Sequence, residues 1–281
     1  MPQIRAPRSA SSDGLEPLLA EQLAYYRAVA PTYGETAVPE VGETTLKAAA
    51  AELAAAIEEF GVAGDVLELA CGPGTWTESL LPGATSLTAV DAAPEMLAVV
   101  RSRIADERVR FVQADIFDWT ADRLYDCVFF GFWLSHVPLE RFESFWAMVA
   151  TALKPTGRVL FVDDGYRIEE ELIDGPQSST IHRALTDGTR YRILKVPHAP
   201  DALEAKLRGL GWDITVRSTS GPFYWGSGSL RMHQQFRGIT RICAGTSSAN
   251  ADLAIRGRRA PGYSTSRCGT RHASRAGRAA R

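Results

Sequence analysis

Carboxylate side chains stand at the ends of three apolar segments in the first half of the chain: Glu68, Asp91 and Asp115. If these segments are parallel strands, their carboxyl ends meet at one edge of a sheet, where open α/β sheets bind ligands. Glu68 suits an ammonium group, and Asp91 can accept hydrogen bonds from both hydroxyl groups of a ribose. The sequence therefore predicts a site for a nucleoside ligand that carries a positive charge.

A glycine-containing turn, Ala-Cys-Gly-Pro-Gly-Thr-Trp-Thr at residues 70–77, joins the first apolar segment to a helical pattern. A site for a nicotinamide dinucleotide would need Gly-x-Gly-x-x-Gly here, with the helix N-terminus aimed at a pyrophosphate. Thr77 stands where the third glycine should be, and Glu68 would repel a pyrophosphate. Both features favour a ligand without phosphate.

The segment 68–75 resembles motif I of the class I methyltransferases that use S-adenosylmethionine (SAM). The family pattern is acid-x-Gly-x-Gly-x-Gly; here Ala70 replaces the first glycine, and Thr75-Trp76 replaces the last. The turn Leu-Lys-Pro-Thr-Gly at 153–157 and the pattern aromatic-x-x-x-Ala-x-x-Tyr at 26–33 are similar to further segments of this family. The resemblance covers residues 25–228.

The resemblance implies that SAM is the cofactor and that each predicted strand end contributes to its site. In the family, the acid at Asp115 recognises the adenine amino group and the residue at Ile116 covers the ring, while the tyrosines at 26 and 33 close over the cofactor. The predicted cofactor-binding residues are Tyr26, Tyr33, Glu68, Ala70, Cys71, Gly72, Gly74, Trp76, Asp91, Ala92, Met96, Asp115, Ile116 and Phe132. For the two tyrosines, simple interfacial packing is the alternative reading.

His136 is the first candidate for a catalytic base, because it follows the fourth predicted strand on the loop that faces the methyl group. The alternative is that His136 packs or caps the next helix. Asp163 and Asp164 could bind the acceptor, orient a histidine, or form a solvated strand end. No metal is expected: residues 131–133 contain no acid, and the histidines at 182 and 198 have no ligand partners at fixed spacing.

These features predict methyl transfer from SAM to a small, largely apolar acceptor, most simply O-methylation of a hydroxyl or carboxylate by in-line displacement. N- or C-methylation of a small molecule, and a non-catalytic SAM-binding module, are the alternatives; a polyamine synthase and a nucleic-acid methyltransferase rank lower. Aromatic residues suggest the apolar acceptor site: Phe132, Trp133, Tyr166, Tyr191, Phe223, Tyr224 and Trp225.

The hydrophobic pattern predicts an α/β fold: a Rossmann-like, doubly wound, seven-stranded sheet, mostly parallel with an antiparallel last strand and helices on both faces. The expected strands are 66–69, 86–90, 109–114, 125–130, 158–163, 212–219 and 221–226, and the expected helices include 44–60, 139–153 and 200–210. Residues 154–157 should form a turn. Asp187-Gly188 predicts a hairpin turn within an insertion, 165–199, that shapes the acceptor site.

We expect a disordered N-terminus at 1–15, a helical lid segment at 16–60, a SAM-binding core at 61–230 and a basic, disordered tail at 231–281. The tail holds eleven arginines and one acid, so it carries +10 while the rest of the chain carries −12. An acidic body disfavours a nucleic-acid acceptor.

The start of the chain lacks a signal-peptide pattern, apolar runs are too short to cross a membrane, and the four cysteines show no paired spacing. We therefore expect a cytoplasmic protein without membrane partners, and the sequence is compatible with a homodimer.

Overall fold

Near-continuous apolar runs form the central strands of one sheet, as strands buried on both faces require. The computed structural model describes residues 12–33, 43–165, 167–175 and 178–231, all within the first of two units of the chain, Met1–Gly238. The sheet strands are β1 (Gly64–Leu69), β2 (Ala84–Asp91), β3 (Val109–Gln113), β4 (Tyr125–Gly131), β5 (Leu153–Asp164), β8 (Trp212–Ser218) and β9 (Phe223–Leu230).

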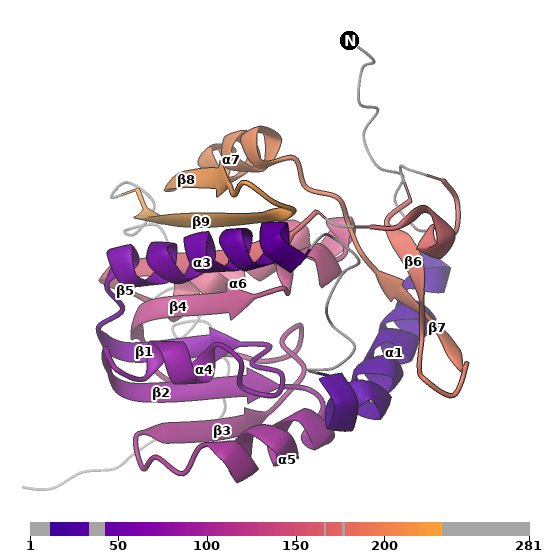
Figure 1. Ribbon diagram of the computed structural model, residues 1–281. Helices are drawn as coiled ribbons and strands as arrows, with labels where there is room; N and C mark the ends of the chain where they lie inside the picture. Colours follow the sequence, from indigo (N-terminus) through magenta and orange to yellow (C-terminus); the bar gives the residue numbers. More distant parts are fainter. Residues whose placement is uncertain (1–11, 34–42, 166, 176–177, 232–281) are drawn as a thin grey trace, which may run out of the picture. The chain divides into compact units, whose positions relative to one another are not determined.

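These seven strands lie in the order β3-β2-β1-β4-β5-β9-β8 (Figure 1). β1 to β5 pair in parallel, whereas β9 is antiparallel to both of its neighbours, β5 and β8. This order reverses direction between β1 and β4, which creates the crevice where such sheets bind ligands. The predicted fold is confirmed.

Helices cover both faces of the sheet. α3 (Glu43–Phe60), α4 (Thr77–Leu80) and α5 (Pro94–Arg103) pack their apolar side chains on one face, and α6 (Phe142–Ala152) and α7 (Pro200–Gly209) on the other. α5 and α7 both begin with a proline in the first turn, where its fixed φ suits a helix and its missing N–H costs nothing.

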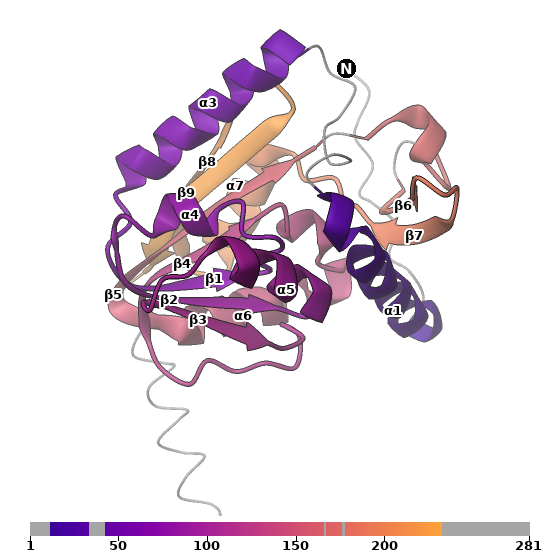
Figure 2. The same cartoon turned by 60° about the horizontal axis from the view of Figure 1, so that its bottom comes forward.

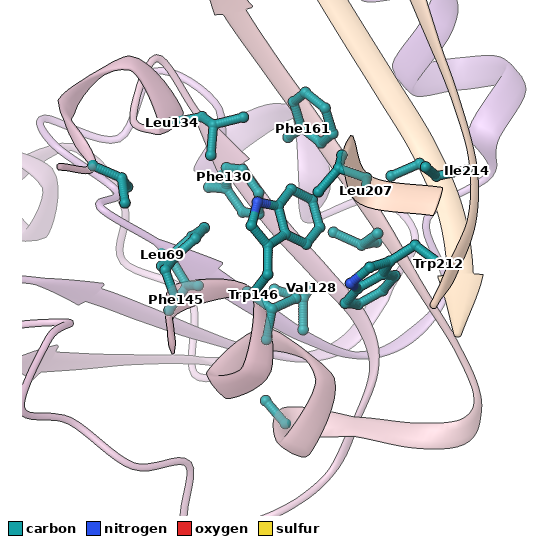
Figure 3. Close-up of a cluster of buried hydrophobic side chains, with 14 of the residues drawn as sticks. Leu69, Val128, Phe130, Leu134, Phe145, Trp146, Phe161, Leu207, Trp212 and Ile214 are labelled. Atoms are coloured by element: carbon teal, nitrogen blue, oxygen red, sulfur yellow. The ribbon is translucent and has the colours of Figure 1, made fainter. Parts of the chain in front are cut away.

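Aromatic side chains fill the core between α6 and the sheet (Figure 3). Trp146 lies edge-on to Phe130, Phe161 and Trp212, with ring centroids 5.0 to 5.7 Å apart. These rings are fully buried and reach across three strands. This packing holds β4 rigid, and the loop after β4 carries His136.

One further layer lies beyond the carboxyl ends of the parallel strands, at the right of both Figure 1 and Figure 2. It consists of α1 (Ser12–Val29), which continues into the short helix Ala30–Thr32, and the hairpin of β6 (Thr180–Ala184) and β7 (Arg190–Leu194). The hairpin at Asp187-Gly188 is therefore confirmed. No helix in the part of the chain that the structure describes is long and apolar enough to cross a membrane.

Three local predictions were wrong. α1 begins at Ser12 rather than after residue 15, because Leu15 packs with Leu18 and Leu194. The helix expected at 139–153 divides into a short 3₁₀ helix, Leu139–Arg141, and α6. Residues 154–157, expected as a turn, belong to β5.

Residues 154–157 form a bulge within β5 and so remain part of the sheet. Tyr125 pairs with Leu153 but Cys127 pairs with Arg158, so the intervening residues protrude from the ladder. Lys154 Nζ holds this bulge down by donating to Asp65 and Asp126 at 3.0 and 2.7 Å. Of the ends expected to be disordered, 1–15 and 231–281, residues 1–11 and 232–281 lie outside the described residues, so their disorder stays a prediction.

Candidate active site

A cavity of about 310 Å³ opens between α1 and the carboxyl ends of the parallel strands. Loops that follow β1, β2, β3 and β4 form its floor, and α1 covers it. Its described lining residues are Glu16, Leu19, Ala20, Gln22, Leu23, Tyr26, Tyr33, Ala70, Gly72, Asp91, Ala92, Met96, Asp115, Ile116, Phe117, Gly131, Phe132, Trp133 and His136. Ten of the fourteen predicted cofactor-binding residues, and His136, therefore lie around one cavity.

The loop after β1 reaches the cavity through unusual backbone geometry. Ala70 has φ +52°, in the left-handed region that an L-residue enters at a cost of about 1–2 kcal/mol. This explains why the family pattern prefers glycine at that position. Asp91 holds the loop from β2: its carboxylate accepts hydrogen bonds from the backbone N–H groups of Gly72 and Ala93, both at 2.8 Å. Burial raises the pKa of Asp91 above its ordinary value.

Aromatic rings form the wall next to Asp115. The carboxylate of Asp115 accepts a hydrogen bond from the backbone N–H of Phe117 at 2.9 Å. The Phe117 ring lies 5.7 Å from the Trp133 ring, and both residues line the cavity. The guanidinium of Arg141 lies 4.9 Å from the centre of the Phe117 ring. These rings form an apolar wall beside a carboxylate, which suits a purine base.

His136 and Tyr26 form a hydrogen-bonded pair across the cavity wall. His136 lies in the short helix Leu134–His136 and is 5% exposed. Its Nδ1 is 2.6 Å from the Leu194 carbonyl oxygen, and its Nε2 is 2.8 Å from the Tyr26 hydroxyl. A carbonyl can only accept, so Nδ1 carries the proton and Tyr26 donates to Nε2. Burial, with a smaller effect of Lys195, holds the pKa of His136 well below its usual value.

Four predicted cofactor residues lie outside the described lining: Glu68, Cys71, Gly74 and Trp76. Glu68 Oε2 accepts a hydrogen bond from the Thr77 hydroxyl at 2.6 Å, and burial raises the pKa of Glu68 to about 8. Trp76 lies behind the cavity wall, against Phe132, where a Cβ on Gly131 would come within 2.4 Å of its indole nitrogen. Their roles toward the cofactor stay predictions.

Asp163 and Asp164 support the loop before His136. The fully buried carboxylate of Asp163 accepts from the backbone N–H and the hydroxyl of Ser135 at 2.8 and 2.9 Å. Lys195 Nζ donates to Ser135 Oγ and to Asp164, at 3.0 and 2.8 Å. The reading of Asp163 as a solvated strand end was wrong, because the hairpin brings Lys195 over it.

α1 contributes more residues to the site than the predicted Tyr26. Glu16, Leu19, Ala20 and Leu23 line the cavity at the spacing i, i+3, i+4, i+7 of one helix face, and this spacing is visible in the sequence. The expected aromatic acceptor site is only partly formed: Phe132 and Trp133 line the cavity, but Tyr224 is buried in the core and Tyr166 lies outside the described residues.

The cavity fits a nucleoside with a positive charge better than a phosphate. Its described lining includes the carboxylates of Asp91 and Asp115 and that of Glu16, which forms an ion pair with Arg141; the described lining residues include no lysine or arginine. A pyrophosphate would need cationic or N–H donors in that position. Among the described residues, His, Cys, Asp and Glu side chains form no group of three that could hold a metal ion.

Comparison with known proteins agrees with this chemistry. Residues 66–157 match the family described as a methyltransferase domain. Two solved structures of DhpI, one in complex with S-adenosylhomocysteine (SAH) and one with SAM and HEP, are 39% and 40% identical to this chain. Each similarity covers 78% of this chain and 98% or 99% of DhpI, with TM-scores of 0.64 and 0.66.

A second relative is similar over a shorter stretch. Trans-aconitate 2-methyltransferase of Escherichia coli O139:H28 (strain E24377A / ETEC) is 35% identical over 94 residues, which are 33% of this chain and 36% of that protein. The chain thus spans about a third of the length of the curated relatives that it matches. Because the DhpI structures are similar over nearly their whole length, the chain belongs to the class I SAM-dependent methyltransferases, with SAM as its cofactor.

Proposed function

We propose that this protein transfers the methyl group of SAM to a carboxylate oxygen of a small organic acid. The similarity to a methyltransferase named for trans-aconitate, a carboxylic acid, supports this acceptor class. The cavity, of about 310 Å³, is at the lower end of the range of small-molecule sites, which supports a small acceptor.

The described lining residues are proposed to hold SAM at the carboxyl edge of the sheet. Asp115, Ile116 and Phe117 would bind the adenine, and Asp91 would accept hydrogen bonds from the ribose hydroxyls. Ala70 and Gly72 would bring backbone close to the methionine part. Met96, Ala92 and Phe132 would supply apolar contacts, and Tyr26 and Tyr33 would close the site from the lid segment.

The state of His136 is the observation that carries the choice of a carboxylate. Methylation of an alcohol needs a base to remove the hydroxyl proton, and an effective base has a pKa near the working pH. His136 has a pKa well below its ordinary value, and both of its ring nitrogens are occupied. A carboxylate is already ionised at neutral pH, so it needs no base and only has to be oriented.

The residues of this chain orient the acceptor and SAM relative to each other. SAM, when bound, presents a methyl group on a positively charged sulfur, which a nucleophilic oxygen can attack in line. The Tyr26–His136 hydrogen bond fixes one wall of the cavity. The positive charges of Lys195 and Arg183 help to lower the pKa of His136. Holding two reactants in line can by itself lower a barrier by about 7–11 kcal/mol.

The test is the chemical nature of the methyl product. Purified protein is incubated with methyl-labelled SAM and a set of mono-, di- and tricarboxylic acids, each paired with the alcohol or amide of the same skeleton. A methyl ester releases labelled methanol in mild base, whereas a methyl ether, an N-methyl or a C-methyl group does not. We expect base-labile label from the acids alone. Base-stable label from the paired alcohols would replace this proposal with hydroxyl methylation and restore His136 as a base.

A further inference from the structure

Gln22 on α1 lines the cavity with its side-chain amide in a single defined orientation. The Gln22 Oε1 atom accepts a hydrogen bond from the backbone N–H of Leu194 in β7 at 3.0 Å. A backbone N–H can only donate, so the amide oxygen must face β7. The amide nitrogen, Nε2, must then point the other way.

Among the described residues, Gln22 Nε2 has no hydrogen-bond acceptor. The side chain is 4% exposed, and within the described part of the chain its recorded hydrogen bond is the one to Leu194. The described side-chain atoms that are both sealed from solvent and unpaired do not include Nε2. This nitrogen is therefore not sealed from solvent, and the residue that carries it lines the cavity. A buried amide with a free N–H₂ in a binding cavity calls for an oxygen on the ligand, because an unmade hydrogen bond costs free energy.

The same backbone unit that orients Gln22 also orients His136. Leu194 donates its N–H to Gln22 and accepts the Nδ1 proton of His136 at its carbonyl. Tyr26, one helical turn after Gln22, lies on the same face of α1 and donates to His136. The donor hydrogens of Tyr26 and His136 are thus used within the protein, and Gln22 Nε2 is the donor of this group left for a ligand.

Gln22 belongs to the part of the chain that surrounds the matched methyltransferase domain. Residues 66–157 match the methyltransferase domain, and both Gln22 and Leu194 lie outside this segment. Parts added around a shared cofactor-binding core are where acceptor specificity can differ between enzymes.

We propose that Gln22 is a specificity-determining residue whose Nε2 donates a hydrogen bond to one oxygen of the acceptor carboxylate, while the other oxygen attacks the methyl group. This assignment rests on the proposed carboxylate methylation. It selects acids over alcohols, because an alcohol has a single oxygen and cannot both attack and accept from Gln22 in this way.

The test is Gln22→Glu, which keeps the oxygen that faces Leu194 and replaces the N–H₂ donor by a second, negative oxygen. We expect the KM for a carboxylate acceptor to rise at least about tenfold, as the loss of one hydrogen bond to a charged group predicts. The Kd for SAH, measured by calorimetry, should change less than about twofold. Glu21→Gln is the matched control: Glu21 precedes Gln22, holds β7 through the N–H and side chain of Arg192, and is absent from the described lining.

These measurements separate a role of Gln22 in acceptor binding from a role in cofactor binding or in stability. A KM that is unchanged in Gln22→Glu, or changed equally in Glu21→Gln, overturns the assignment. An SAH affinity that falls as much as the acceptor affinity would show that Gln22 binds the cofactor carboxylate instead, which also overturns it. A wild-type enzyme that binds SAM but yields no base-labile methyl label refutes the proposed function, independently of any variant. Gln22→Met, which removes both amide atoms, checks the result by thermal unfolding: if it lowers only stability and leaves KM unchanged, the residue is structural.

Discussion

Replacing Glu68 by glutamine should stabilise the ligand-free protein, and more so at higher pH. Glu68 is 1% exposed, and its Oε1 has no hydrogen-bond partner among the described residues. Burial raises its pKa from 4.5 to about 8. Glutamine has nearly the same shape and never ionises, so Glu68→Gln isolates the cost of this buried titratable group.

Proton linkage gives the sign and size of the effect of Glu68 on the free energy of unfolding. The folded state binds the Glu68 proton more tightly than the unfolded state, so this contribution is complete below pH 4.5 and is lost as pH rises toward 8. Within this window each pH unit costs the folded state about 1.4 kcal/mol. Between pH 5.5 and 7.5 the wild type should therefore lose about 3 kcal/mol relative to Glu68→Gln.

Urea unfolding of both proteins at pH 5.5 and 7.5 measures this difference, and ligand must be absent because a bound cation would favour ionised Glu68. The control is Glu78→Gln, an exposed carboxylate paired with Arg103, which should change stability by less than about 1 kcal/mol at either pH. A stability difference between wild type and Glu68→Gln that is the same at both pH values would refute the reasoning, because it would show that Glu68 does not stay protonated in the folded state.

Three further predictions concern the loop, the cofactor and the core. Ala70→Gly should be neutral or stabilising by up to about 1 kcal/mol in urea unfolding, because relief of the left-handed backbone is offset by the greater freedom of glycine in the unfolded chain; a clear destabilisation would contradict the strain. Asp91→Ala should raise the Kd for SAH by at least about tenfold in calorimetry, since it removes a charged hydrogen-bond acceptor, and an unchanged Kd would argue against ribose binding there. Trp146→Ala should cost about 3–5 kcal/mol of unfolding free energy. A loss below about 1 kcal/mol would mean that the core collapses into the space left by the indole ring.

Much of the fold could be predicted because each central strand carries its own signal. Buried runs such as β1 and β4 are mostly apolar, and helices such as α5 and α7 begin at recognisable residues, Pro94 and Pro200. The bulge at 154–157 could not be predicted, because Lys-Pro-Thr-Gly is a turn by local preference. Its place on the sheet depends on Lys154 reaching two carboxylates that are distant in sequence.

The sequence by itself determined which residues stand at the carboxyl ends of the strands, and so placed Asp91, Asp115 and His136 around one cavity. Local pattern suffices for this, because strand direction and end follow from the chain itself. Only the tertiary structure decided which way the side chains face and what they meet: Glu68 turns toward Thr77, and Gln22 and His136 share the backbone of Leu194 across more than fifty residues of chain. Hydrogen-bond direction and burial are properties of the packed neighbours, so the roles of these groups emerge only once the hairpin and α1 meet.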